Sequence, residues 1–125
     1  AVIARYNVVS APVAAQMALG AAEAAGADIA VSVTGLAGPS GGDAVRPVGT
    51  VYLGAARGGT VYVKKLYVSR PGRALVRARA AQAALEMALR LAEDKVPAGT
   101  KALAKSVQHD AAALTALDDF FLRAE

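Results

Sequence analysis

The sequence of 125 residues contains no cysteine and no tryptophan, and aromatic residues make up only 5% of it. The absence of cysteine excludes a disulfide scaffold, a cysteine-ligated zinc site and a thiol nucleophile. Chains without disulfides are the rule in reducing compartments. We therefore expect a cytoplasmic protein whose nucleophile, if it has one, is not a thiol.

Long hydrophobic runs are missing as well. None approaches the roughly 20 residues of a membrane-spanning helix, and no basic leader precedes an apolar signal segment, so we expect no membrane partner. Lys and Arg number 14 against 10 Asp and Glu, and this net charge of +4 favours anionic partners without selecting one. With 55% hydrophobic residues, the composition predicts a single globular domain over residues 1–125.

A helix is predicted to begin at Ser10 and to end at Gly26. Ser10 is a favoured N-cap, and Pro12 lies in the first turn, where its missing N–H does no harm. Apolar residues recur at helical spacing and indicate a narrow, alanine-rich inner face: Val13, Met17, Ala21 and Ala24. Such a face should pack closely on a neighbour.

Strands and further helices follow. A buried strand is predicted from Ile29 to Val33, and a hairpin joins strands 51–57 and 61–68 through Gly58-Gly59. The spacing then predicts a helix over 73–95, whose inner side we assign to Leu75, Val76, Leu85, Met87, Leu89 and Leu91. A last helix over 100–125 is predicted to be capped by Thr100. This order predicts an α/β fold.

The stretch from Asp28 to Thr50 is the predicted functional centre. Its buried strand gives way at Thr34 to a loop that contains four glycines: Gly35, Gly38, Gly41 and Gly42. Glycines allow backbone N–H groups to approach a ligand closely, and a loop at the end of a buried strand is the usual ligand position in an α/β sheet. The motif is neither a phosphate-binding P-loop nor a dinucleotide fingerprint.

Three strings carry a family resemblance: residues 10–14 (SAPVA), 32–42 (SVTGLAGPSGG) and 46–51 (RPVGTV). In order and spacing they resemble the CinA C-terminal domain, the nicotinamide-nucleotide amidohydrolase family, from about Ala4 to Leu91. The resemblance implies a three-layer α/β/α fold with a mixed sheet, commonly dimeric. It also implies hydrolysis of the carboxamide of nicotinamide mononucleotide (NMN) to nicotinate mononucleotide and ammonia, without a metal or cofactor.

By the same resemblance, Thr34 matches a hydroxyl residue of the substrate loop, Gly35 to Gly42 match the loop itself, and Arg73 matches the arginine of a Gly-Asp-Arg turn. Here that turn reads Pro-Gly-Arg, without the acidic residue. The family strings Ala-Glu-Ser-Cys-Thr-Gly-Gly and Tyr-Ser-Asn-x-x-Lys, which supply a proposed catalytic serine, tyrosine and lysine, do not occur in these 125 residues. We therefore expect this chain alone to be weakly active or inactive. The alternatives for that segment are deletion, a place outside these 125 residues, or supply by a further chain.

Amide hydrolysis needs an activated nucleophile or a base-activated water near the loop. Thr34 is the only hydroxyl at the end of the strand and the one catalytic candidate. The titratable candidates are Asp28, Asp43 and Arg46 beside the loop, Lys64 and Lys65 in the hairpin, and the remote His109. Since Lys64 and Lys65 alternate across a strand, at most one can face the site. His109-Asp110 is interpreted as a surface pair.

Plainer interpretations remain open for each candidate. The glycines also suit tight turns, Thr34 can bond nearby backbone, and Arg73 can be a solvated first-turn residue. A non-catalytic or engineered binding or assembly domain of the same family is the alternative function. A third alternative is weak nucleic-acid binding through Lys64, Lys65, Arg70, Arg73, Arg77 and Arg79, but no aromatic platform or reading motif accompanies them.

Apolar surface predicts a partner. The helix that begins after Ser10 and the last helix together offer more apolar surface than a three-stranded sheet can cover. We expect a homo-oligomer.

Overall fold

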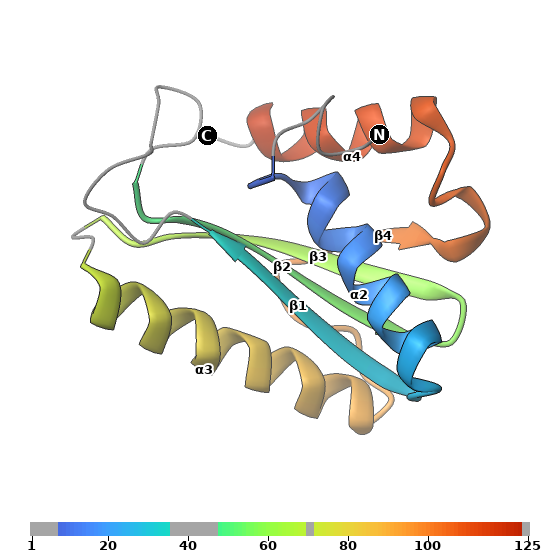
Figure 1. Ribbon diagram of the computed structural model, residues 1–125, viewed down its shortest axis with the longest axis horizontal. Helices are drawn as coiled ribbons and strands as arrows, with labels where there is room; N and C mark the ends of the chain where they lie inside the picture. The colour runs from blue at the N-terminus through green and yellow to red at the C-terminus, as the bar shows by residue number, and fades with distance from the viewer. Residues whose placement is uncertain (1–7, 36–47, 70–71, 124–125) are drawn as a thin grey trace.

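The computed structural model describes residues 8–35, 48–69 and 72–123. Among these residues four strands and three α-helices form three layers, with α2 and α4 on one face of the sheet and α3 on the other (Figure 1). The elements are α2 (Ala11–Ala25), β1 (Ile29–Gly35), β2 (Thr50–Arg57), β3 (Thr60–Tyr67), α3 (Arg73–Ala92), β4 (Lys101–Ala104), the 3-10 turn η1 (Lys105–Val107) and α4 (Ala111–Arg123). The predicted α/β/α arrangement is confirmed.

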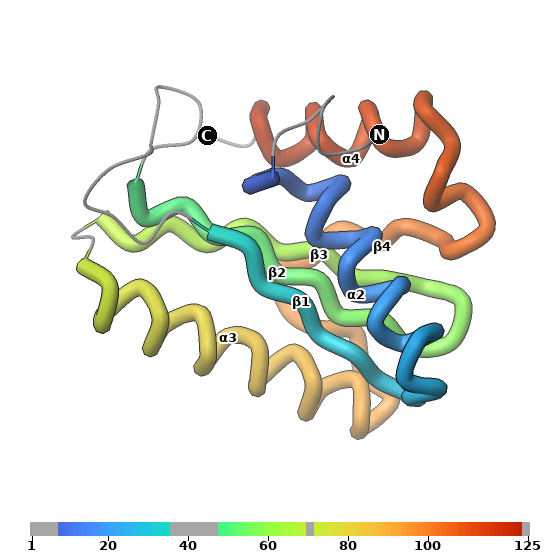
Figure 2. The backbone as a smooth tube through the Cα atoms, in the orientation of Figure 1, coloured from blue at the N-terminus to red at the C-terminus, as the bar shows by residue number. Residues whose placement is uncertain are grey.

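The sheet has the strand order β1-β2-β3-β4, and all three pairings among the described strands are antiparallel. The predicted mixed sheet is not found among the described strands, because each of their pairings is antiparallel. The hairpin through Gly58-Gly59 is confirmed, with Arg57 paired to Thr60. The backbone trace in Figure 2 shows the strands running side by side beneath α2.

Helix α2 begins and ends where the sequence predicts. The Ser10 Oγ accepts a hydrogen bond from the Val13 N–H at 3.3 Å, and Gly26 ends the helix in the left-handed region at φ 61°. The inner face is different from the predicted one, because Met17, Ala21 and Ala24 are exposed. The residues that pack on the sheet are Ala11, Ala14, Ala15, Ala18 and Leu19.

Close contact between α2 and β2 depends on Gly54. A Cβ at this position would lie 2.5 Å from the Ala14 carbonyl oxygen and 2.8 Å from the Ser32 Oγ. The Ser32 hydroxyl donates a hydrogen bond to the same carbonyl at 2.6 Å. Small residues on both elements thus bring a helix and a strand backbone together.

Helix α3 confirms half of its predicted inner side, because Val76, Met87 and Leu91 are buried. Leu75, Leu85 and Leu89 are 40%, 62% and 55% exposed and lie on the outer side. The buried residues follow the helical period without a break: Val76, Ala80, Ala83, Met87 and Leu91. Our prediction favoured the largest apolar side chains over the period, and the alanines at the close contacts were missed.

The C-terminal part is not one helix from Thr100. Residues Lys101–Ala104 form β4, which pairs with β3, and α4 begins only after Asp110. Asp110 is the true N-cap, because its Oδ1 accepts from the N–H groups of Ala112 and Ala113 at 2.9 and 3.2 Å. Thr100 instead donates its hydroxyl to the Pro97 carbonyl at 2.7 Å. A free edge of β3 outweighs the helical propensity of the KALA sequence.

Helix α4 packs beside α2 on the same face of the sheet. Its inner residues Leu114, Leu117 and Phe121 join the core that α2 forms with the sheet. The rings of Phe121 and Tyr52 meet edge to face, with centroids 5.8 Å apart and planes at 90°. Apolar surface for which we expected a second copy of the chain is therefore covered, in part, by the chain itself. The homo-oligomer stays a prediction.

Gly54→Ala is expected to lower the free energy of unfolding by about 1–3 kcal/mol, because the added methyl forces α2 away from β2. Gly20→Ala is the matched control, since a Cβ at Gly20 meets nothing within 4 Å. In the interior of α2 it should raise stability by about 1 kcal/mol. Urea denaturation measures both, and equal effects of the two variants would contradict the close packing.

Candidate functional site

The candidate site lies at one end of the sheet, where β1 ends and β2 begins. Pairing of Gly35 with Val51 brings the end of β1 beside the start of β2. The Val68 N–H, just after β3, donates to the Gly49 carbonyl at 3.0 Å and ties the end of β3 to the same place. Helix α3 begins at this end, as Figure 1 shows, and its far end is fixed by an Arg57 hydrogen bond to the Leu91 carbonyl.

Thr34 is held at the end of β1 by a backbone hydrogen bond. Its Oγ1 donates to the Val8 carbonyl at 2.8 Å, and the side chain is 9% exposed. A hydroxyl whose proton is directed at a carbonyl is not hydrogen-bonded to a base. This geometry matches the plainer interpretation of Thr34, and its catalytic role stays a prediction.

Gly35 is required by packing. A Cβ there would lie 2.9 Å from the Val51 Cγ2 and 3.1 Å from the Thr50 carbonyl oxygen. The close pairing of β1 with β2 therefore explains this glycine without a ligand. The other predicted loop glycines, Gly38, Gly41 and Gly42, lie outside the described residues, as do Asp43 and Arg46.

Arg73 is the first residue of α3 and is exposed. The N-cap before it, Gly72, makes no side-chain hydrogen bond to the helix. The first N–H groups of a helix have no partner within it, and its dipole favours a negative charge at this end. An exposed guanidinium beside these donors is a suitable arrangement for an anion such as phosphate.

The remaining candidates do not assemble around Thr34. Asp28 precedes β1 and lies at the opposite end of this strand, about 20 Å away at the usual rise per residue. His109 contacts α2, where its Nδ1 is 3.4 Å from the Gln16 Nε2.

Register separates the two lysines, as predicted. Lys65 pairs with Tyr52, which itself pairs with Thr34, so these three residues lie in one row on the α2 face. Lys64 pairs with Leu53 and faces α3. Two strand spacings, about 10 Å, separate the backbones of Thr34 and Lys65. The fully buried Tyr52 ring lies between them. Sequence reasoning missed this row, because only the strand register reveals it.

No group of three or more His, Asp or Glu residues that could hold a metal ion occurs within residues 8–35, 48–69 and 72–123. In the same part of the chain, none of the helices is long and apolar enough to cross a membrane. The basic residues considered for nucleic acid do not form one surface, since Lys64 and Lys65 face opposite sides and Arg70 is not described.

Comparison with known proteins identifies the family. A model of the CinA C-terminal domain matches residues 1–92. The chain belongs to this family. It is 51% identical over 87 residues to the nicotinamide-nucleotide amidohydrolase PncC of Enterobacter agglomerans, which covers 69% of this chain and 52% of that protein. It is 57% identical over 63 residues to a CinA-like protein of Geobacter sp. (strain M21), covering 50% of this chain and 15% of the relative.

Solved structures agree with this assignment. The competence/damage inducible protein CihA of Agrobacterium tumefaciens superposes with a TM-score of 0.70 at 38% identity, covering 73% of this chain and 56% of that one. A CinA superfamily protein of Escherichia coli has a TM-score of 0.66 at 38% identity, covering 72% and 52%. The matched part of the chain thus spans about half the length of the PncC relative and of these two solved structures, and 15% of the Geobacter protein. The family match ends at residue 92, so β4 and α4 lie beyond it.

Thr34→Val is expected to lower the free energy of unfolding by about 1 kcal/mol, because it removes the hydrogen bond to Val8 while keeping the shape of the side chain. Thr34→Ser keeps the hydroxyl and should stay within about 0.5 kcal/mol of the parent protein. Thermal unfolding of the two variants separates them. If Thr34→Val is as stable as the parent, the hydrogen bond is not structural and the hydroxyl is available for another role.

Proposed function

We propose that this chain is the mononucleotide-binding part of an amidohydrolase that acts on NMN. The single observation that carries the proposal is the 51% identity to the nicotinamide-nucleotide amidohydrolase PncC over 87 residues. A protein of this type would convert NMN and water to nicotinate mononucleotide and ammonia. The substrate-binding residues would be Thr34, Gly35, Gly38, Gly41, Gly42 and Arg73.

The phosphate of the mononucleotide would lie at the start of α3. Arg73 offers a guanidinium that can bind two phosphate oxygens, and the first N–H groups of the helix can donate to the same anion. Gly35, the last residue of β1, pairs with Val51 near the start of β2. The end of β1, the start of β2 and the start of α3 would therefore surround the bound mononucleotide.

Catalysis would require groups beyond these. Cleavage of a carboxamide needs an attacking oxygen and a group that protonates departing ammonia. Thr34 donates its hydroxyl to the Val8 carbonyl, and Asp28 and His109 are held elsewhere. We infer that the 125 residues bind the substrate better than they hydrolyse it, and that the family's serine, tyrosine and lysine segment would complete the site.

A non-catalytic binding or assembly domain of the same family is the second candidate. The specific observation in its favour is the Thr34 hydrogen bond to backbone, which leaves no nucleophile–base pair among the described residues of this site. The two candidates differ in one outcome, because only the first gains activity when the missing catalytic groups are supplied.

Calorimetric titration with NMN tests the binding site. Arg73→Ala should weaken binding by about 1.5–3 kcal/mol, the range for hydrogen bonds to charged groups. Arg79→Ala is the matched control, since it removes an exposed arginine of the same helix away from its N-terminus. An equal loss in the two variants would indicate a general charge effect, and an unchanged affinity in Arg73→Ala would exclude the phosphate position.

Release of ammonia from NMN tests the catalytic inference. The 125-residue chain should release ammonia at a rate near background, because loss of a nucleophile and its base costs several orders of magnitude. Addition of the N-terminal segment of a PncC relative as a second chain should restore turnover. If the chain alone turns over at about 1 per second or faster, an ordinary enzyme rate, the catalytic groups lie within these 125 residues.

A further inference from the structure

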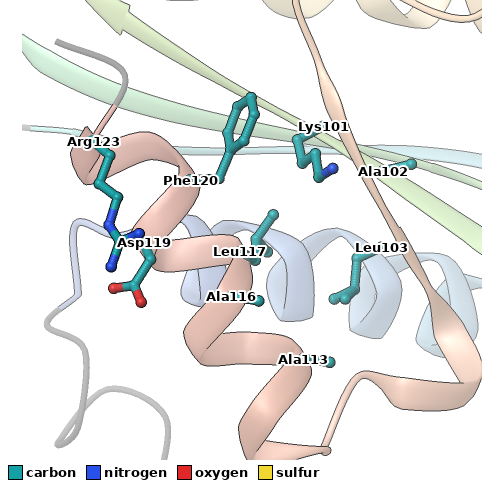
Figure 3. Close-up of a pocket in the computed structure, with 9 residues that line it drawn as sticks. All are labelled: Lys101, Ala102, Leu103, Ala113, Ala116, Leu117, Asp119, Phe120 and Arg123. Carbon is teal, nitrogen blue, oxygen red and sulfur yellow. The ribbon is translucent and has the colours of Figure 1, made fainter.

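The C-terminal region contains a groove that lies outside the site described above. It runs between the edge strand β4 and helix α4 and has a volume of about 700 Å³. Figure 3 shows the side chains of Lys101, Leu117 and Phe120 between the strand and the helix, with Arg123 at the end of α4. Both elements follow residue 92, where the family match ends. The groove is therefore a feature of this chain and not of the matched domain.

One wall of the groove is an unpaired strand edge. Within the described residues β4 pairs only with β3, on one side. The Lys105 N–H donates to the Gly59 carbonyl at 2.8 Å, which fixes the odd-numbered residues of β4 as the ones bonded to β3. The N–H and C=O of Ala102 consequently point outward, away from the sheet. These two groups form one ready-made pair of hydrogen-bonding positions for another strand.

The other wall supplies apolar contacts. Leu117 and Phe120 of α4 line the groove together with Leu103 of β4. Phe120 is 46% exposed, although its neighbour Phe121 is buried in the core. An aromatic ring left half in water at the rim of a groove can contact a side chain that projects from an added strand. A strand edge flanked by such a helix is the arrangement by which domains bind extended peptides.

Charge at the rim selects the kind of peptide. The Lys101 Nζ lies 5.2 Å from the centroid of the Phe120 ring, which holds the ammonium group at the groove. Lys101 and Arg123 are the cations of the lining, and Asp119 is its single carboxylate. The net charge of the groove lining is therefore positive, and it complements acidic side chains. Two copies of the chain paired through this edge would bring these cations together, which disfavours self-association here.

We propose that the groove between β4 and α4 binds an extended peptide segment with alternating apolar and acidic residues, which pairs with the outward N–H and C=O of Ala102. The apolar side chains of this peptide contact Leu117 and Phe120. Its carboxylates lie near Lys101 and Arg123. The peptide adds a fifth strand to the described sheet, next to β4.

Fluorescence anisotropy with a labelled six-residue peptide of alternating valine and glutamate tests the proposal. The peptide should bind at least tenfold more tightly than its valine–lysine counterpart. Ala102→Pro removes the outward N–H but leaves the bonds between β4 and β3, so it should weaken binding about tenfold, the factor that corresponds to 1.4 kcal/mol. Ala102→Ser keeps the N–H and should bind within about twofold of the parent.

The double variant Lys101→Gln/Arg123→Gln should lose the preference for glutamate over lysine while keeping the same melting temperature. Several results would overturn the proposal: no binding at millimolar peptide, equal binding of the two peptides by the parent protein, or full binding by Ala102→Pro. Sedimentation that shows a dimer dissociated by Ala102→Pro would assign the groove to a second copy of the chain instead. None of these outcomes depends on NMN, so the proposed function is tested separately.

Discussion

Strand β2 lies at the centre of the structure, where it pairs with β1 and β3 and packs against α2 and α3. Seven of its eight residues, from Thr50 to Ala56, are buried. Its Tyr52, Gly54 and Ala56 face α2 and α4, while Val51, Leu53 and Ala55 face α3. Since both faces are covered, β2 has no polar side, and its sequence is a nearly continuous apolar run. Both helical layers are positioned by this one strand.

The close approach at Gly54 has a consequence for the candidate site. Because a Cβ at position 54 would lie 2.5 Å from the Ala14 carbonyl oxygen, α2 can approach β2 this closely only because the residue is glycine. The same contact fixes Ser32, whose hydroxyl bonds the Ala14 carbonyl, and therefore the register of β1. Thr34 lies two residues further along β1, at the strand end from which the loop departs. A buried helix–strand contact thus determines where the proposed ligand-binding groups lie.

Local signals in the sequence predicted the elements that have local causes. The cap at Ser10, the stop at Gly26 and the turn at Gly58-Gly59 are each determined by the conformational preferences of single residues. Strand β4 could not be predicted in this way. The KALA sequence favours a helix, and only the free edge of β3, distant in sequence, makes it a strand. The burial of Leu75, Leu85 and Leu89 was predicted wrongly for a related reason. The close contact of α3 with the sheet is made by alanines, and the sequence alone does not show this contact.

The sequence predicted where the strand before the glycine-rich segment ends, and the chemistry of that end was less predictable. Strand β1 ends at Gly35, beside the start of β2, although Val33 is exposed and the strand is only partly buried. That a ligand binds there stays a prediction. Whether a hydroxyl is a nucleophile or a structural donor depends on what lies beside it. The hydrogen bond from the Thr34 hydroxyl to the Val8 carbonyl joins residues 26 positions apart, and no pattern in the sequence predicts it.

The central claim is that a mononucleotide binds at the end of the sheet where α3 begins. Amide chemical shifts recorded during titration of the isotopically labelled chain with NMN test it most directly, because they report on each residue. The account predicts that the largest changes occur at Thr34, Gly35, Thr50 and Arg73, with little change at Gly58 and Gly59 in the hairpin turn. Changes confined to the hairpin turn, or none at saturating NMN, would contradict it.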